Sequence, residues 1–180
     1  MKKFISLALA AAMTLSLVPV SAFVSTDNRI SNVVTVEKDT ELKDVTSIPK
    51  IQITDDKEDL KDALKDAKAT VAFELVLDGA EWVEDNMANG DVVENAAQVD
   101  ATFEKLTSTR ALVTLKSKNG DAKDDFDGVS ISLKGVKVTS DTAKVTIDPK
   151  NTTVSANTFT FAKSVNGGAI ITVDGTKDFY

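Results

Sequence analysis

The sequence contains no cysteine and no histidine, and these two absences remove much of the usual chemistry of protein sites. A chain without cysteine has no disulfides, so an ordinary hydrophobic core must stabilise it, with or without bound cations. The commonest general base, the Ser-His and Cys-His nucleophile pairs, and the usual ligation of zinc, copper or haem are also lost. Carboxylates, lysines and one tyrosine remain for catalysis.

Long apolar runs are scarce too, and the one clear run stands at the start of the chain. Lys2 and Lys3 precede an apolar stretch over residues 4–18, which Pro19 ends and the slender residues 20–22 follow. This order predicts a signal peptide over residues 1–22, cut after Ala22 or one or two residues later; a buried N-terminal helix is the alternative. No later stretch approaches the roughly 18 apolar residues of a membrane span, so we expect none in the mature chain.

The charge balance is acidic. The whole chain has a formal net charge of −7, and removal of Lys2 and Lys3 with the signal peptide leaves 19 basic and 28 acidic residues, or about −9. Such a charge repels nucleic acid, and no basic patch interleaved with aromatic residues argues otherwise. We expect one domain, because the 158 residues that would remain of the 180 suit a single core.

Most of the remaining chain has the pattern of short strands. Segments rich in Val, Ile, Thr and Phe alternate apolar and polar residues and are separated by Asn-Gly and Asp-Gly turns. This rhythm predicts a mostly β fold, an antiparallel β-sandwich of the Ig-like or cohesin-like type or a related barrel. The predicted strands lie within residues 32–38, 48–54, 70–79, 110–117, 129–140, 143–148, 158–163 and 169–175.

Two segments have helical spacing and predict short capping helices. Residues 55–68 place Leu60, Ala63, Leu64 and Ala67 on one stripe, with Asp55 and Glu58 spaced as a cap and its partner. Residues 90–106 repeat apolar side chains at helical spacing and predict a second helix over an open end of the sandwich. That second stripe consists of Val92, Ala96, Val99, Phe103 and Leu106.

The segments suggest three parts: a signal peptide over 1–22, an extended leader or edge strand over 23–47, and a β-sandwich domain over 48–180. The last strand pattern ends a few residues before Tyr180, with no polar tail. This ending suits the N-terminal part of a longer polypeptide.

Several phrases of the sequence carry a family resemblance. The signal sequence, "TDNRISNVVTVEKDT", "FELVLDGAEWVED", "SISLKGVKVTSDTAKVTID" and "VSANTFTFAKS" together resemble the N-terminal region of clostridial-type S-layer and S-layer-homology cell-surface proteins. The repeated S-layer-homology module, the usual anchor of that family, is not found in these 180 residues. The resemblance implies an exported, non-catalytic, β-rich module at the cell surface or in the cell wall of a Gram-positive-type bacterium.

An acidic loop is the densest cluster of potential ligands. Asp121, Asp124, Asp125 and Asp127 lie within seven positions, and calcium accepts irregular cages of carboxylate and carbonyl oxygens. The spacing does not fit an EF-hand, because Lys123 and Phe126 fall where ligands and a glycine are needed. An irregular calcium site and a solvated acidic turn remain open, and calcium is the one cofactor that the sequence suggests.

A second candidate site surrounds the only tryptophan. Trp82 lies beside Glu81, and a tryptophan flanked by carboxylates can stack on a sugar while the acids accept hydrogen bonds from its hydroxyl groups. Strand alternation, however, places Trp82 on the opposite face from Glu81 and Val83, which favours a core position.

These observations lead to one function and two alternatives. We expect an exported, non-catalytic structural module of the cell envelope, with no catalytic residues, that self-associates or binds other envelope components. An extracellular carbohydrate- or protein-binding module is the main alternative. A secreted hydrolase that uses carboxylates is a third, although no acid pair stands out from the general acidity.

Overall fold

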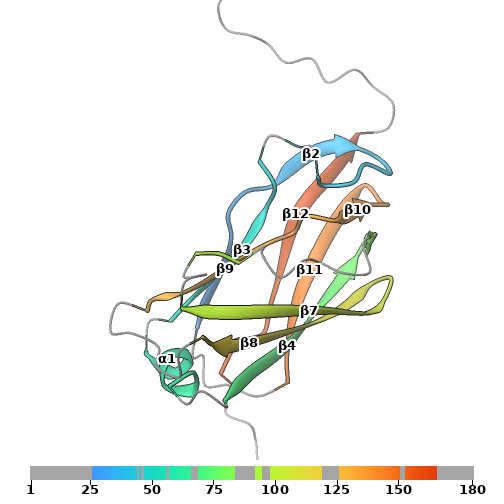
Figure 1. Ribbon diagram of the computed structural model, residues 1–180. Helices are drawn as coiled ribbons and strands as arrows, with labels where there is room; N and C mark the ends of the chain where they lie inside the picture. The colour runs from blue at the N-terminus through green and yellow to red at the C-terminus, as the bar shows by residue number, and fades with distance from the viewer. Residues whose placement is uncertain are drawn as a thin grey trace, which may run out of the picture.

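The computed structural model describes residues 26–43, 45, 47–55, 57–65, 69–83, 92–94, 98–118, 126–150 and 153–165, with only the backbone described for 92–94. Within these residues the chain forms twelve strands and one short helix (Figure 1). The predicted class, mostly β, is confirmed. The predicted signal peptide and the predicted strand over 169–175 lie outside the described residues.

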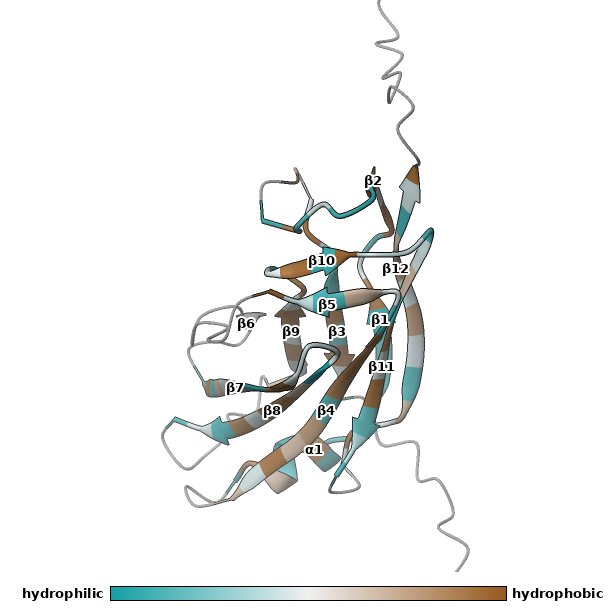
Figure 2. Cartoon of the chain, turned by 90° about the vertical axis from the view of Figure 1, so that its right-hand side faces the viewer, coloured by the Kyte–Doolittle hydropathy of each residue, from teal (hydrophilic) through white to brown (hydrophobic). Residues whose placement is uncertain are grey.

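The strands form three sheets, and neighbours are antiparallel except for β2 and β12, which are parallel. The six-stranded sheet has the order β2 (Val34–Glu37), β12 (Asn157–Val165), β11 (Thr142–Pro149), β4 (Thr70–Asp78), β8 (Arg110–Ser117), β7 (Val99–Thr107). The four-stranded sheet has the order β1 (Asp27–Ile30), β3 (Lys50–Thr54), β9 (Gly128–Ser132), β6 (Val92–Glu94). A small third sheet pairs β5 (Ala80–Trp82) with β10 (Val136–Val138) (Figure 2).

Alternation along the strands creates a single core. In β8, Ala111, Val113 and Leu115 are fully buried, and the residues between them face outward. Side chains of both large sheets, such as Ile51 of β3 and Phe73 of β4, belong to one continuous hydrophobic cluster. Because full burial of such a side chain contributes about 1.5–3 kcal/mol, this cluster supplies most of the stabilisation that the chain needs in place of disulfides.

A glycine redirects the chain from the six-stranded sheet to the small sheet. Gly79, between β4 and β5, has a φ of 72°, in the left-handed region that favours glycine. A Cβ atom at this position would lie 2.3 Å from the carbonyl oxygen of Thr142. The carbonyl of Gly79 also accepts hydrogen bonds from the backbone N–H groups of Thr139 and Ser140, at 2.9 and 3.1 Å. The turn therefore ties β4 to the segment between β10 and β11.

The first predicted helix is present but starts later than expected. Helix α1 covers Asp59–Ala63 and lies at one end of the molecule (Figure 1). Glu58, expected as the partner of the cap, is itself the N-cap, with a left-handed backbone and no side-chain capping bond. Asp55 does accept hydrogen bonds from the N–H groups of Leu60 and Lys61, at 3.1 and 2.7 Å. One carboxylate thus satisfies two N–H groups of the first turn.

The second predicted helix is wrong. Residues 90–106 include β6 and most of β7. Val99 and Phe103 are four residues apart, a spacing that fits one face of a helix and also one face of a strand. In β7 the buried residues are Val99, Ala101 and Phe103, and the side chains of Asp100 and Thr102 between them are exposed. The period is therefore two, and the long pairing of β7 with β8 decides the structure.

Hydrogen bonds join the start of the described chain to the segment before β12. The backbone N–H of Thr26 donates to Oγ of Ser155 at 3.1 Å, and the N–H of Ser155 donates to Oγ1 of Thr26 at 3.0 Å. Buried Asn28 of β1 donates through Nδ2 to the carbonyl of Ser155 and to Oδ1 of Asn157, at 2.7 and 2.9 Å. We call this group, Thr26, Asn28, Ser155 and Asn157, the clasp. It connects β1 of the four-stranded sheet with β12 of the six-stranded sheet.

Two strands come from the segment that the sequence suggests as a leader. β1 is at the edge of the four-stranded sheet and β2 at the edge of the six-stranded sheet. Val36 of β2 is buried in the common core. Among the described residues, no helix is both long and apolar enough to cross a bilayer.

Candidate functional site

A group of interacting charges lies on the outward face of the six-stranded sheet. Strand alternation puts Glu74 of β4 on the face opposite to the core residues Phe73 and Leu75. Arg110 of β8 donates through Nε to Oε2 of Glu74 at 2.7 Å, and its Nη2 contacts the same oxygen. Lys150, just after β11, places its Nζ 2.9 Å from Oε1 of Glu74.

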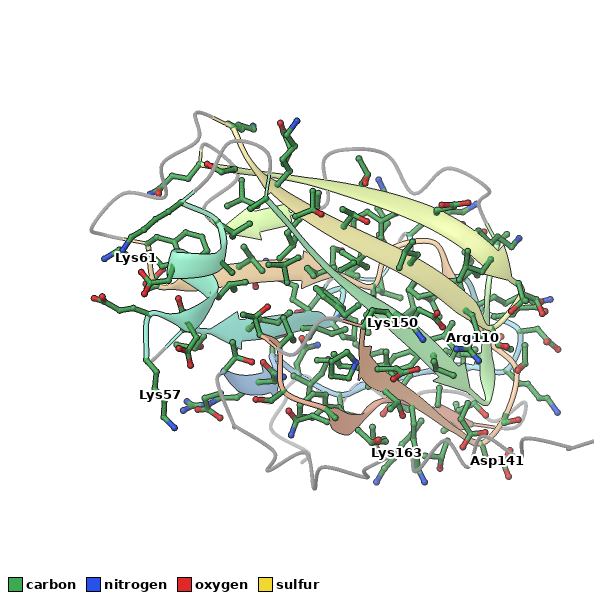
Figure 3. All side chains as sticks on the ribbon, turned by 90° about the horizontal axis from the view of Figure 1, so that it is seen from below. Lys57, Lys61, Arg110, Asp141, Lys150 and Lys163 are labelled. Carbon is green, nitrogen blue, oxygen red and sulfur yellow. The ribbon has the colours of Figure 1, made fainter. Side chains whose placement is uncertain are left out.

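A second carboxylate completes this group, which we call the Glu74 cluster: Glu74, Arg110, Asp148 and Lys150. Asp148 lies directly opposite Glu74 in the register of β4 and β11, an arrangement that would be repulsive for two isolated carboxylates. Its Oδ2 lies 3.3 Å from Nζ of Lys150 and 3.7 Å from Nη2 of Arg110. The two cations therefore offset the repulsion and join three strands. Figure 3 shows the Arg110 and Lys150 side chains reaching toward the same part of the sheet.

The electrostatics of the cluster favour the ionised forms of Glu74 and Lys150. The hydrogen bonds from Lys150 and Arg110 lower the pKa of Glu74, although its side chain is only 10% exposed and burial acts in the opposite direction. The bonds to Glu74 and Asp148 in turn raise the pKa of Lys150. A general acid needs the opposite perturbation, a carboxyl pKa raised toward neutrality. This cluster is therefore suited to holding strands together and to presenting fixed charges.

Strand β5 of the small sheet directs the side chains of Trp82 and Glu81 to opposite faces. Trp82 in β5 is only 1% exposed, so its ring belongs to the core and offers no open face for stacking on a sugar. Glu81 points to the other side, where its Oε1 lies 3.4 Å from Nζ of Lys137, its register partner in β10. Nζ of Lys137 also lies 3.8 Å from Oδ1 of Asp39. The structure thus assigns Trp82 to packing and Glu81 to a surface ion pair.

The predicted calcium loop falls mostly outside the described residues. Asp121, Asp124 and Asp125 lie there, and only Asp127 is described. The backbone carbonyl of Asp127 accepts a hydrogen bond from the N–H of Asp55 at 2.8 Å, which connects the end of the loop to the start of the α1 region. In the part of the chain that the structure describes, no group of three or more acidic residues could hold a metal ion. The calcium site stays a prediction.

A polar cleft lies beside Asp127, on the face of the four-stranded sheet. It has a volume of about 240 Å³ and lies over β1, β3 and the start of β9. Arg29 of β1 is the register partner of Gln52 in β3, and Asp27 is the partner of Thr54, so these four side chains share one face. The lining residues are Arg29, Gln52, Ile53, Thr54, Asp127, Gly128 and Val129.

Sequence reasoning predicted neither the Glu74 cluster nor the cleft, and of their residues it singled out only Asp127. Glu74 and Arg110 are 36 residues apart, and Lys150 is a further 40 residues along the chain. The available signal was the placement of charged residues at outward positions of predicted strands. Such placement predicts on which face of the sheet a charged side chain lies, but it does not predict the register between strands. The register decides which charged side chains meet.

No protein-family model, curated protein or solved structure matches the chain.

Proposed function

We propose that the protein is an exported, non-catalytic structural module of the bacterial cell envelope, of the S-layer-like or surface-scaffold kind. Its partners would be further copies of the same chain or other envelope components. Export is proposed from the N-terminal segment, in which two lysines precede an apolar run and slender residues follow it.

The observation that carries the proposal is the Glu74 cluster. Its most buried carboxylate is bound to two cations, and their hydrogen bonds keep its pKa low. Other described carboxylates are also bound in ion pairs across or beside strands, as Glu81 is with Lys137 and Asp100 with Lys118. Acids paired in this way stabilise an acidic β surface, and the lowered pKa of Glu74 does not suit this carboxyl to proton donation.

At the level of fold we propose a β-sandwich of the Ig-like or cohesin-like type. Support comes from two large sheets of four and six strands whose side chains share one hydrophobic cluster. In such a sandwich the outward sheet faces and the edge strands remain for contacts between molecules. A chain without cysteine and histidine suits this role, because such a surface is chemically inert outside the cell.

The first experiment is light scattering of residues 23–180 during a calcium titration from excess chelator to about millimolar concentration, the range of weak extracellular calcium modules. We expect the molar mass to grow with calcium and to fall again when chelator is added. Magnesium is the control ion, and a variant with Asn at positions 121, 124, 125 and 127 is the control protein. A monomer under all conditions would contradict calcium-dependent assembly by these residues.

A binding module remains the second candidate function, and a specific observation favours it. The cleft over β1, β3 and β9 brings several kinds of hydrogen-bonding side chain to one place on a sheet face. Saturable binding of a glycan or a protein ligand by a monomer would support this candidate over a scaffold.

A further inference from the structure

We propose that the C-terminal segment, residues 166–180, adds a strand to the outer edge of β2 in the same molecule. This segment lies outside the described residues, and its sequence predicts a strand over 169–175. The pairing does not depend on the proposed structural role. Three features support it: the exposed edge of β2, the place where β12 ends, and the side-chain pattern of the segment.

The backbone of β2 faces away from β12 at every second residue. The N–H of Ser164 in β12 donates to the carbonyl of Asp141 at 2.9 Å, so the backbone groups of Ser164 face β11. The backbone groups of the preceding residue, Lys163, therefore face β2, where Thr35 is its register partner. In a parallel pair a residue bonds to the two neighbours of its register partner, so the N–H and C=O of Thr35 itself face away from β12.

This outer side of β2 is accessible. β2 is the last strand at one end of the six-stranded sheet, and within the described ranges only β12 pairs with it. Thr35 and Glu37 are exposed, and Val33, just before the strand, is 48% exposed. At the other end of the sheet, Val99 and Ala101 of β7 are only 1% and 5% exposed. Exposed edges accept added strands, and β2 is the more open of these two edges.

β12 brings the chain to this edge. Its last residue, Val165, is the register partner of Glu37, and the two strands lie side by side at one end of the molecule (Figure 1). A strand beyond β2 lies two strand spacings from β12, or about 9.5 Å. Ala169 is four positions after Val165, and four extended residues span up to about 13–14 Å. The linker 166–168, Asn-Gly-Gly, is therefore long enough to pass the end of β2, and its composition suits a reversal.

Two other places in the same sheet are closed to the segment. A tight hairpin at 166–168 would put the new strand directly beside β12, but there β12 already pairs with β11 on one side and with β2 on the other. The edge at β7 lies beyond β11, β4 and β8, which is too far for a linker of this length. The outer side of β2 is within reach.

The inward side chains of the segment fit this edge of the core. Ala169, Ile171 and Val173 occupy alternate positions, so an extended strand turns all three to one face. In β2, Val36 is buried in the core, and Val34 is partly buried and packs against it. A strand with its apolar face inward continues this row of side chains and covers more of Val34. Burial of such apolar surface stabilises the pairing.

The outward side chains favour a register with Thr172 opposite Thr35. The reversal makes the new strand antiparallel to β2, and cross-strand pairs of threonines are favourable in such sheets. The outward N–H and C=O of Thr35 then bond to those of Thr172. The one acid of the predicted strand, Asp174, lies opposite Val33 and meets no like charge.

The added strand changes what the molecule offers to its neighbours. An open edge can pair with other chains, and natural proteins commonly cover or shorten such edges. Here the chain covers its own edge and holds β2, which comes from the N-terminal part, between two C-terminal strands. Contacts between copies must then use other surfaces.

The test is amide hydrogen exchange followed by NMR on residues 23–180 in excess chelator. We expect the N–H of Thr35 to exchange at least about tenfold more slowly than in a Thr172→Pro variant, because proline at 172 interrupts the added strand. Thr176→Pro is the matched control: it lies beyond the predicted strand and should leave exchange at Thr35 unchanged. Nuclear Overhauser contacts between β2 and residues 169–175 should accompany the protection.

Thr35→Pro tests the same pairing from the other strand. The N–H of Thr35 is not used in the pairing with β12, and proline is tolerated where an edge strand faces outward, so β2 should keep its place. Circular dichroism shows whether this variant is folded. The N–H of Thr172 should then exchange about tenfold faster or more. Thr35→Val keeps the N–H and should behave like the unmodified chain.

The proposal is overturned if the N–H of Thr35 exchanges equally fast in the unmodified chain and in Thr172→Pro. Protection that disappears on dilution also overturns it, because the segment would then come from another copy. Contacts of residues 169–175 with a strand other than β2 are a third contrary result. Light scattering during the calcium titration reports the scaffold role separately, so the two proposals can fail independently.

Discussion

Replacement of Glu74 by glutamine tests whether the Glu74 cluster stabilises the fold. Hydrogen bonds to charged partners contribute about 1.5–3 kcal/mol each when they are well shielded. Here the side chains of Arg110 and Lys150 are 43% and 40% exposed, so solvent screens the interactions and only part of that energy is expected. Glutamine also keeps one oxygen as an acceptor. We therefore expect Glu74→Gln to lower the free energy of unfolding by about 1–2 kcal/mol and the Tm by about 2–8 °C.

The lowered pKa of Glu74 also predicts how the stability difference between the two proteins changes with pH. The two cations lower the pKa of Glu74 in the folded chain below its ordinary value of 4.5. As the pH falls past that value, the unfolded chain takes up this proton before the folded chain does, so the stabilisation is lost. The difference between the unmodified chain and Glu74→Gln should thus be constant from neutral pH to about pH 5 and shrink below 4.5.

Urea denaturation followed by circular dichroism at several pH values measures both effects. Glu104→Gln is the matched control: Glu104 lies in the same cross-strand row of the sheet, is exposed, and has no ion pair among the described residues. We expect this variant to stay within about 0.5 kcal/mol of the unmodified chain. Equal effects of the two substitutions, or a difference for Glu74→Gln that grows in acid, would refute the reasoning.

Three further outcomes are expected. Gly79→Ala should destabilise the fold by about 2 kcal/mol or more, since its Cβ would meet the carbonyl of Thr142, and a Tm equal to that of the unmodified chain would contradict this. Asn28→Ala breaks the clasp and should lower the free energy of unfolding in urea by about 1–3 kcal/mol, because the partly buried oxygens of Ser155 and Asn157 lose their donor. Fluorescence from Trp82 should resist acrylamide quenching until the chain unfolds; ready quenching of the native protein would place the ring outside the core.

Local pattern predicted the strands well where alternation is the only consistent interpretation. Residues 110–117 were expected as one strand and form β8 with those bounds. Residues 129–140 were expected as a single strand and form β9 and β10 instead, in two different sheets. Gly135, with a φ of 77°, precedes β10, and its conformation could not be read from apolar spacing.

The error over residues 90–106 has a physical origin. A spacing of four residues satisfies both periods, and only Ala101 between Val99 and Phe103 distinguishes the strand from the helix. The Glu74 cluster could not be predicted from the sequence for another reason. Glu74, Arg110 and Lys150 meet because β4 pairs with β8 on one side and with β11 on the other, and register is a property of the whole sheet.

The clasp also has a consequence for the order of events in folding. It joins residues 129 positions apart, so it closes only when nearly all of the described chain is present. Contacts between such distant residues require costly loop closure and slow the folding of β proteins. A chain that leaves the cell through a narrow channel must stay unfolded until it has passed. If the chain is exported as proposed, the late closing of the clasp would delay the native state until Ser155 has followed Thr26 through the channel, which would keep the polypeptide competent for translocation.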